Sequence, residues 1–178
     1  MHSLSIVIPV FNAELTLQTL IGQLTAILPE IADYFEIILV DESSTDNSWN
    51  IIKQLKGGSS RVQGIRLSRN YGQHNALLCG IRAARFDVVV TMDDDLQNPV
   101  SEIPKLVQGL ERGFDVVYGT PERQQHGILR NLASTLTKLA LENVMGAETA
   151  RKVSAFRAFR TRLRDGFKNY NSPFVSID

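Results

Sequence analysis

Several features are scarce in this sequence, and each absence argues against a class of protein. Cys79 is the only cysteine, so no disulfide can form within the chain, as is usual in reducing compartments. No apolar run approaches the roughly 20 residues that a membrane-spanning helix needs. Basic and acidic residues are equal in number, at 19 each, so the net charge gives no reason to expect nucleic-acid binding.

Two glycine-rich motifs that bind phosphate are also missing. A dinucleotide-binding fold would carry Gly-x-Gly-x-x-Gly after its first strand, and a P-loop would carry Gly-x-x-x-x-Gly-Lys. Neither follows the first apolar run, at residues 4–10. A nucleotide phosphate bound here would need another neutralising group, and a divalent cation held by carboxylates can serve.

The chain does contain a regular alternation of strand-like and helix-like segments. Hydrophobic residues make up 43% of its 178 residues, which is enough for one domain with a proper core. The predicted strands are residues 4–10, 36–40, 62–67, 87–92, 114–118 and 153–159, and the predicted helices are residues 15–28, 48–55, 75–84, 101–111, 129–144 and 162–167. This alternation predicts an α/β fold: a Rossmann-like, mostly parallel sheet with helices on both faces.

The fourth predicted strand ends in three aspartates, Asp93, Asp94 and Asp95. Two unit charges about 4 Å apart repel by about 4 kcal/mol at an effective dielectric constant near 20. A divalent cation with oxygen ligands removes this repulsion. In an extended segment Asp93 and Asp95 lie on one side, Gln97 adds a neutral oxygen there, and Asp94 points elsewhere. The alternative is a solvated acidic loop that caps a helix.

Polar residues also follow the first two predicted strands, at residues 9–12 and at Asp41 and Glu42. Ligands of an open parallel sheet bind beyond the carboxyl ends of its strands. We therefore expect these residues and the aspartates to converge on one crevice. That convergence favours a binding site over three unrelated solvated loops.

Three segments together resemble the inverting glycosyltransferases of family 2, which have the GT-A fold. They are SIVIPVFN at 5–12, EIILVDESSTD at 36–46 and TMDDDLQNP at 91–99, and residues 70–76 followed by Gly80 also fit. The tail of the third segment, residues 96–99, resembles the subgroup that transfers a sugar to a polyprenyl phosphate. The resemblance is specific over residues 4–119 and looser over residues 123–167.

The resemblance implies a nucleotide diphosphate sugar, linked to uridine or guanosine, as donor. Pro9, Val10 and Asn12 are then expected to line the pocket for base and ribose, and Asp41 to hydrogen-bond the base. Asp93 is expected to contact the ribose or the metal region, with a catalytic role. Asp95, a second catalytic residue, and Gln97 are expected to bind the Mg²⁺ or Mn²⁺ that holds the donor diphosphate.

The same resemblance places the acceptor phosphate near two arginines. Arg130 and Ser134 match an Arg-x-x-x-Ser spacing of the subgroup, and Arg157 matches an arginine after a Ser-Gly-Phe pattern. Both arginines are expected to be catalytic. Basic residues outnumber acidic ones between residues 124 and 168, which suits a phosphate-bearing partner or an anionic membrane surface, although a solvated helix face would explain the same pattern.

Together these patterns predict one catalytic domain over residues 1–178. Truncation of this domain at its C-terminus is left open. We expect it in the cytoplasm, free or at the cytoplasmic face of the membrane. Three other functions stay open: a nucleotide-sugar-binding module without turnover, a transferase acting on a saccharide hydroxyl, and a phospho-accepting signalling domain. The second needs a carboxylate base, for which Glu14 and Glu122 are candidates. The third needs its acid pair after the first strand, where this chain has none.

Overall fold

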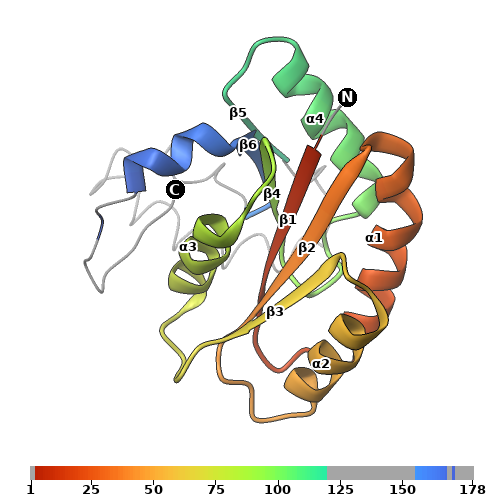
Figure 1. Ribbon diagram of the computed structural model, residues 1–178, viewed down its shortest axis with the longest axis vertical. Helices are drawn as coiled ribbons and strands as arrows, with labels where there is room; N and C mark the ends of the chain where they lie inside the picture. The colour runs from red at the N-terminus through yellow and green to blue at the C-terminus, as the bar shows by residue number, and fades with distance from the viewer. Residues whose placement is uncertain (1–2, 120–154, 168–169, 171–178) are drawn as a thin grey trace, which may run out of the picture.

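A sheet with helices on both faces forms the fold of this protein (Figure 1). The computed structural model describes residues 3–119, 155–167 and 170. The strands are β1 (Ser3–Val10), β2 (Tyr34–Asp41), β3 (Val62–Arg66), β4 (Val88–Thr91), β5 (Val116–Tyr118) and β6 (Arg157–Arg160). The helices are α1 (Leu17–Ile31), α2 (Ser48–Gly58), α3 (Gln73–Ala83) and α4 (Ile103–Glu111), with 3-10 helices η1 (Val100–Glu102) and η2 (Thr161–Phe167).

The strands are ordered β3-β2-β1-β4-β6-β5 across the sheet. β3, β2, β1 and β4 are parallel neighbours, whereas β6 runs antiparallel between β4 and β5. The prediction of an α/β fold with a mostly parallel sheet is therefore confirmed. The antiparallel insertion of β6 was not predicted, because the pattern of a short apolar run does not say which strand it will join.

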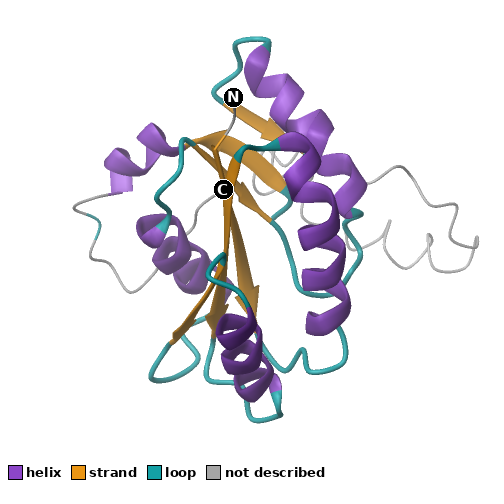
Figure 2. Cartoon of the chain, turned by 45° about the vertical axis from the view of Figure 1, so that its right-hand side comes forward, coloured by secondary structure: helices purple, strands orange, loops and turns teal. Residues whose placement is uncertain are grey.

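Each face of the sheet has its own hydrophobic core. Leu4, Ile6 and Ile8 of β1 face the cluster that α1, α2 and α4 cover, while Val7 faces the cluster under α3. Figure 2 shows the sheet between these helices. Because both faces are covered, β1 and β2 read as continuous apolar runs rather than as an alternation.

The predicted elements differ from the observed ones mainly at their ends. Helix α1 starts at Leu17 instead of residue 15, because the carbonyl of Ala13 closes a turn with the N–H groups of Thr16 and Leu17, and Leu15 is exposed. The last predicted helix, residues 162–167, forms the 3-10 helix η2. The predicted helix at residues 129–144 and the start of the predicted strand at residues 153–159 lie outside the described residues. Within the described ranges no helix is long and apolar enough to cross a membrane.

Gly80 lets α3 pack directly on the middle of the sheet. A Cβ built on this residue would lie 2.4 Å from Val7 Cγ1 and 3.1 Å from Val40 Cγ2. Both valines belong to buried strands and have little room to move. The missing side chain therefore sets how closely α3 approaches β1 and β2, and with it the position of the N-terminus of α3.

We predict that Gly80→Ala lowers the free energy of unfolding by about 1–3 kcal/mol, because the added methyl group overpacks this contact. Gly22→Ala is the matched control, since nothing lies within 4 Å of a Cβ at that helical position. The control should be stabilising by about 0.5–1 kcal/mol, because alanine favours a helix over glycine. Urea denaturation of both variants measures the difference, and equal effects would contradict the packing argument.

Candidate functional site

The loops that follow β1, β2, β3 and β4 surround one cleft of about 420 Å³. This is the edge of the sheet where its parallel strands end. The cleft is lined by Pro9, Phe11, Glu42, Asn70, Gly72, Gln73, Asp93, Asp94 and Asp95. The structure thus brings together residues from all three segments whose convergence the sequence predicted.

Hydrogen bonds join the loops after β1 and β2 into one unit. Asn12 is central: its N–H donates to Ser44 Oγ (3.0 Å), and its Oδ1 accepts from the N–H of Thr45 (2.9 Å). One residue later, the N–H of Ala13 donates to Ser48 Oγ at 2.8 Å. These bonds satisfy backbone groups that leave the sheet, and they fix one wall of the cleft.

A left-handed backbone conformation recurs in the three loops that carry the predicted site residues. Asn12 has φ 54°, Ser43 has φ 62° and Leu96 has φ 63°. This region is uncommon for residues other than glycine, least so for asparagine, and it turns the chain sharply after an extended segment. The surrounding hydrogen bonds hold these conformations, which is typical of functional sites.

Each of the three aspartates is held in a different way. Asp94 Oδ2 accepts from the N–H of Phe11 at 3.2 Å, which ties the loop after β4 to the loop after β1. Asp93 Oδ1 accepts from Gln73 Nε2 at 2.5 Å, and Asp95 Oδ1 accepts from the N–H of Gln97 at 3.0 Å. Asp95 is thus held by its own loop, whereas Asp93 and Asp94 bridge to other elements.

The carboxylates of the cleft repel one another. Burial raises the pKa of Asp93, and the nearby charge of Asp95 raises it further. Burial also raises the pKa of Asp94, where the charges of Asp95 and Asp93 add to the shift. For Glu42, burial is the largest cause of a raised pKa, followed by the charges of Asp94 and Asp41. A cation in this cleft would relieve the repulsion.

The donor set fits a hard divalent cation that shares its ligands with a substrate. The described residues hold no group of three or more His, Cys, Asp or Glu arranged to bind a metal ion. Mg²⁺ usually takes one or two carboxylates together with substrate phosphates and water, rather than a cage made by the protein alone. A carboxylate at Asp95 and an amide oxygen at Gln97 suit that mode of binding.

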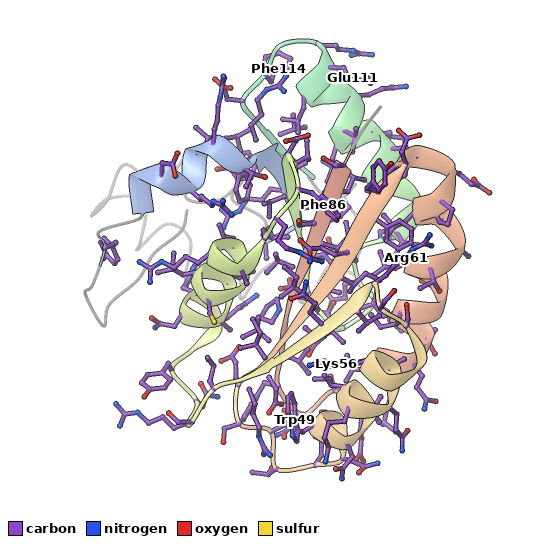
Figure 3. All side chains as sticks on the ribbon, viewed as in Figure 1. Trp49, Lys56, Arg61, Phe86, Glu111 and Phe114 are labelled. Carbon is purple, nitrogen blue, oxygen red and sulfur yellow. The ribbon has the colours of Figure 1, made fainter. Side chains whose placement is uncertain are left out.

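Asp41, which the sequence assigned to a nucleotide base, lies beneath the cleft. It is fully buried, and its Oδ2 is 3.1 Å from Arg66 Nε while its Oδ1 accepts from the N–H of Ser44. The Arg66 guanidinium lies 5.5 Å from the ring centroid of Trp49. Figure 3 labels Trp49 at the end of the sheet where β1 and β2 end. Glu42, the next residue, lines the cleft instead.

The other predicted site residues are spread around this cleft. Pro9 lines the cleft, and Val10 is fully buried in the core. Asn12 hydrogen-bonds Thr45 and so joins the loops after β1 and β2. Gln97 lines an adjacent cleft of about 510 Å³ together with Pro99, Tyr118 and Phe156. Arg157 is buried on β6 with its guanidinium 5.9 Å from the ring centroid of Tyr118, and Arg130 lies outside the described residues.

Comparison with known protein families identifies the chain. The sequence model for "Glycosyl transferase family 2" matches residues 5–171. The chain belongs to glycosyl transferase family 2. The resemblance stated from the sequence is thus confirmed at the level of the family.

Two curated relatives of this family 2 chain carry the same name. Undecaprenyl-phosphate 4-deoxy-4-formamido-L-arabinose transferase of Aeromonas hydrophila is 36% identical over 162 residues, covering 90% of this chain and 50% of the relative. The protein of that name from Pseudomonas fluorescens is 39% identical over 165 residues, covering 92% and 48%. The chain therefore spans about half the length of the curated relatives it matches.

Two solved structures share the fold of this family 2 domain. Staphylococcus aureus TarS 1-349 superposes with a TM-score of 0.63 at 18% identity, covering 96% of this chain and 50% of TarS. Glucosyl-3-phosphoglycerate synthase of Mycobacterium tuberculosis, in complex with Mn²⁺, UDP and phosphoglyceric acid, superposes with a TM-score of 0.62 at 24% identity, covering 91% and 57%. These likenesses confirm the predicted GT-A fold.

Sequence reasoning included residues 70–76 in the family resemblance but gave no site role to the wall of the cleft that follows β3. Asn70, Gly72 and Gln73 line this wall, and Gly72 has φ 86° just before α3 begins. A signal was available, because the rule that ligands bind at the carboxyl ends of parallel strands applies to β3 as well as to its neighbours. Phe11, which also lines the cleft, was noted only as part of a motif.

The repulsion around Glu42 predicts a pH-dependent stability. A raised pKa means that the folded protein holds this proton more tightly than the unfolded chain does, so the contribution of Glu42 to stability falls as the pH rises from about 4 towards neutral. Glu42→Gln removes the charge and should stabilise the fold at pH 7 by about 0.5 kcal/mol, since water in the open cleft screens the repulsion.

Denaturation at several pH values measures this effect, with Glu30→Gln, an exposed position on α1, as the control. The difference between Glu42→Gln and wild type should be near zero at about pH 4 and grow towards neutral pH. A difference that stays constant with pH would contradict the electrostatic explanation.

Proposed function

We propose that this chain is a metal-dependent, inverting glycosyltransferase that transfers a sugar from a nucleotide diphosphate sugar to a polyprenyl phosphate. The observation that carries this proposal is the cleft at the carboxyl edge of the sheet, where Asp93, Asp94, Asp95 and Glu42 gather. The name of the curated relatives, which includes undecaprenyl phosphate, supports the choice of acceptor.

On the donor side, Pro9 and Glu42 would face the base and ribose, and Asn12 would hold the loop that carries them. Asp41 would act indirectly, because the ion pair of its buried carboxylate with the partly exposed Arg66 holds the end of β2 in place. Asp93 would contact the ribose or the metal region. Glu42 replaces Asp41 as the carboxylate that meets the base, because only Glu42 lines the cleft.

Asp95 and Gln97 would hold Mg²⁺ or Mn²⁺. When bound, the cation supplies positive charge against the diphosphate as it leaves. The protein's own part is orientation: the Asp95 carboxylate is held by the N–H of Gln97 at 3.0 Å, so both residues belong to one tight turn. The Gln97 side chain lines the adjacent cleft and Asp95 lines the main one, so the cation would lie between the two clefts.

On the acceptor side, Arg130 and Arg157 would hold the phosphate. A phosphate acceptor is already ionised at neutral pH, so the arginines need only orient it, and no strong general base is required. Arg157 sits on β6 directly opposite Thr91, the last residue of β4, which brings it close to the aspartate loop. Since the acceptor is a membrane lipid, we propose that the protein acts at the cytoplasmic face of a membrane.

Nucleotide binding tests the donor half of this proposal. In a thermal-shift experiment with Mn²⁺, UDP or GDP at 100 times its dissociation constant should stabilise the fold by about 2.7 kcal/mol. Asp95→Ala should remove the part of this stabilisation that depends on Mn²⁺. The control is Asp33→Ala, which changes an exposed aspartate just after the C-terminal end of α1, and it should behave as wild type. Absence of any stabilisation with either nucleotide would overturn the proposal.

A transfer assay tests the acceptor half. We expect transfer from nucleotide diphosphate sugars to undecaprenyl phosphate in detergent micelles, with loss of at least tenfold in rate for Arg157→Ala. Transfer to a saccharide hydroxyl instead would make this a different family 2 transferase. Nucleotide binding with no transfer to either acceptor would make it a binding module.

A further inference from the structure

A hydrogen bond links Gln73, the first residue of α3, to Asp93 of the loop after β4. Gln73 Nε2 donates to Asp93 Oδ1 at 2.5 Å, and both residues line the cleft. An ionised carboxylate can only accept hydrogen bonds, so the amide nitrogen of Gln73 must be the atom that faces it. Hydrogen bonds to a charged group are among the stronger ones in proteins.

The backbone that carries Gln73 is fixed on both sides. Before it, Asn70 Oδ1 accepts from the N–H of Gly72 at 2.8 Å, and Gly72 has the positive φ of 86° that turns the chain into α3. After it, the carbonyl of Gly72 accepts from the N–H groups of Asn75 and Ala76, which closes the first helical turn. Gln73 is therefore the first residue of a helix whose start is defined by its own hydrogen bonds.

Close packing against the sheet holds the helix in position. The close approach at Gly80 seats α3 on Val7 of β1, and β1 pairs directly with β4, the strand that leads to Asp93. The N–H of Met92 also donates to the carbonyl of Val7 at 3.2 Å. Val7 of β1 thus contacts both the helix that carries Gln73 and the segment that carries Asp93. Packing in the core therefore sets the distance between these two residues.

We propose that Gln73 is a positioning residue that fixes the orientation of the Asp93 carboxylate for the nucleotide sugar. Asp93 is flanked by Asp94 and Asp95, and repulsion from these carboxylates would otherwise turn its side chain away from them. The hydrogen bond from the Gln73 amide fixes the Asp93 carboxylate at the α3 wall. The loop then presents Asp93 and Asp95 to different parts of one ligand. This inference rests on the proposed function, since it assigns Asp93 a ligand.

Two variants of Gln73 separate hydrogen bonding from packing. Gln73→Glu keeps the size of the side chain but replaces its donor with an acceptor, and Gln73→Leu removes the polar group. If the donor positions Asp93, both variants should weaken binding of UDP or GDP with Mn²⁺ by about tenfold, and Gln73→Glu more than Gln73→Leu, because it also repels Asp93. If Gln73 only fills space, Gln73→Glu should bind as wild type.

Isothermal titration calorimetry measures these affinities on protein shown by denaturation to be folded. Gln23→Leu, an exposed position in the middle of α1, is the matched control and should not change affinity. If wild type binds a nucleotide and both Gln73 variants bind equally well, the positioning role is wrong and the proposed function stands. If wild type binds neither nucleotide, the proposed function fails.

A spectroscopic measurement tests the contact without any ligand. The side-chain amide signal of Gln73, identified in an ¹H–¹⁵N spectrum by its loss in Gln73→Leu, should shift in Asp93→Asn, because a neutral amide replaces the charged acceptor. An unchanged signal would show that the two side chains do not interact in solution, and would overturn the inference whatever the outcome of nucleotide binding.

Discussion

Repulsion among carboxylates at the end of the sheet is the constraint around which this site is built. One cleft is shared by Asp93, Asp94, Asp95 and Glu42. Burial raises the pKa of Glu42, Asp93 and Asp94, so it disfavours their charged forms. Side chains that repel one another stay together only when the elements that carry them cannot separate. Here the hydrophobic cores on the two faces of the sheet supply that restraint, since β1 touches both.

Loop hydrogen bonds convert this restraint into a defined arrangement of polar groups. The N–H of Phe11 holds Asp94, and the side chain of Asn12 holds the loop after β2. The left-handed conformations of Asn12, Ser43 and Leu96 change the direction of the chain in each of these loops. The result is a cleft that carboxylates from the loops after β2 and β4 line together with polar side chains from the loop after β3.

The site could be predicted from the sequence to the extent that it depends on strand ends. Asp93 and Asp95, which follow β4, and Pro9, the last but one residue of β1, line the cleft, because residues at or just after the end of a parallel strand lie at the carboxyl edge of the sheet. Asp41 and Val10 do not, because the last residues of β1 and β2 still point into the body of the protein. A strand alternates its side chains between two faces, so an error of one residue at its end decides between cleft and core.

The sequence by itself determined the α/β class, the parallel order implied by alternating strands and helices, and the family. These follow from local periodicity and from short motifs, which need no knowledge of distant contacts. Only the tertiary structure decided that β6 enters the sheet antiparallel beside β4, that Arg66 pairs with Asp41, and that Gln73 meets Asp93. The physical reason is the same in each case: these partners are far apart along the chain, and the packing of helices on the sheet brings them together.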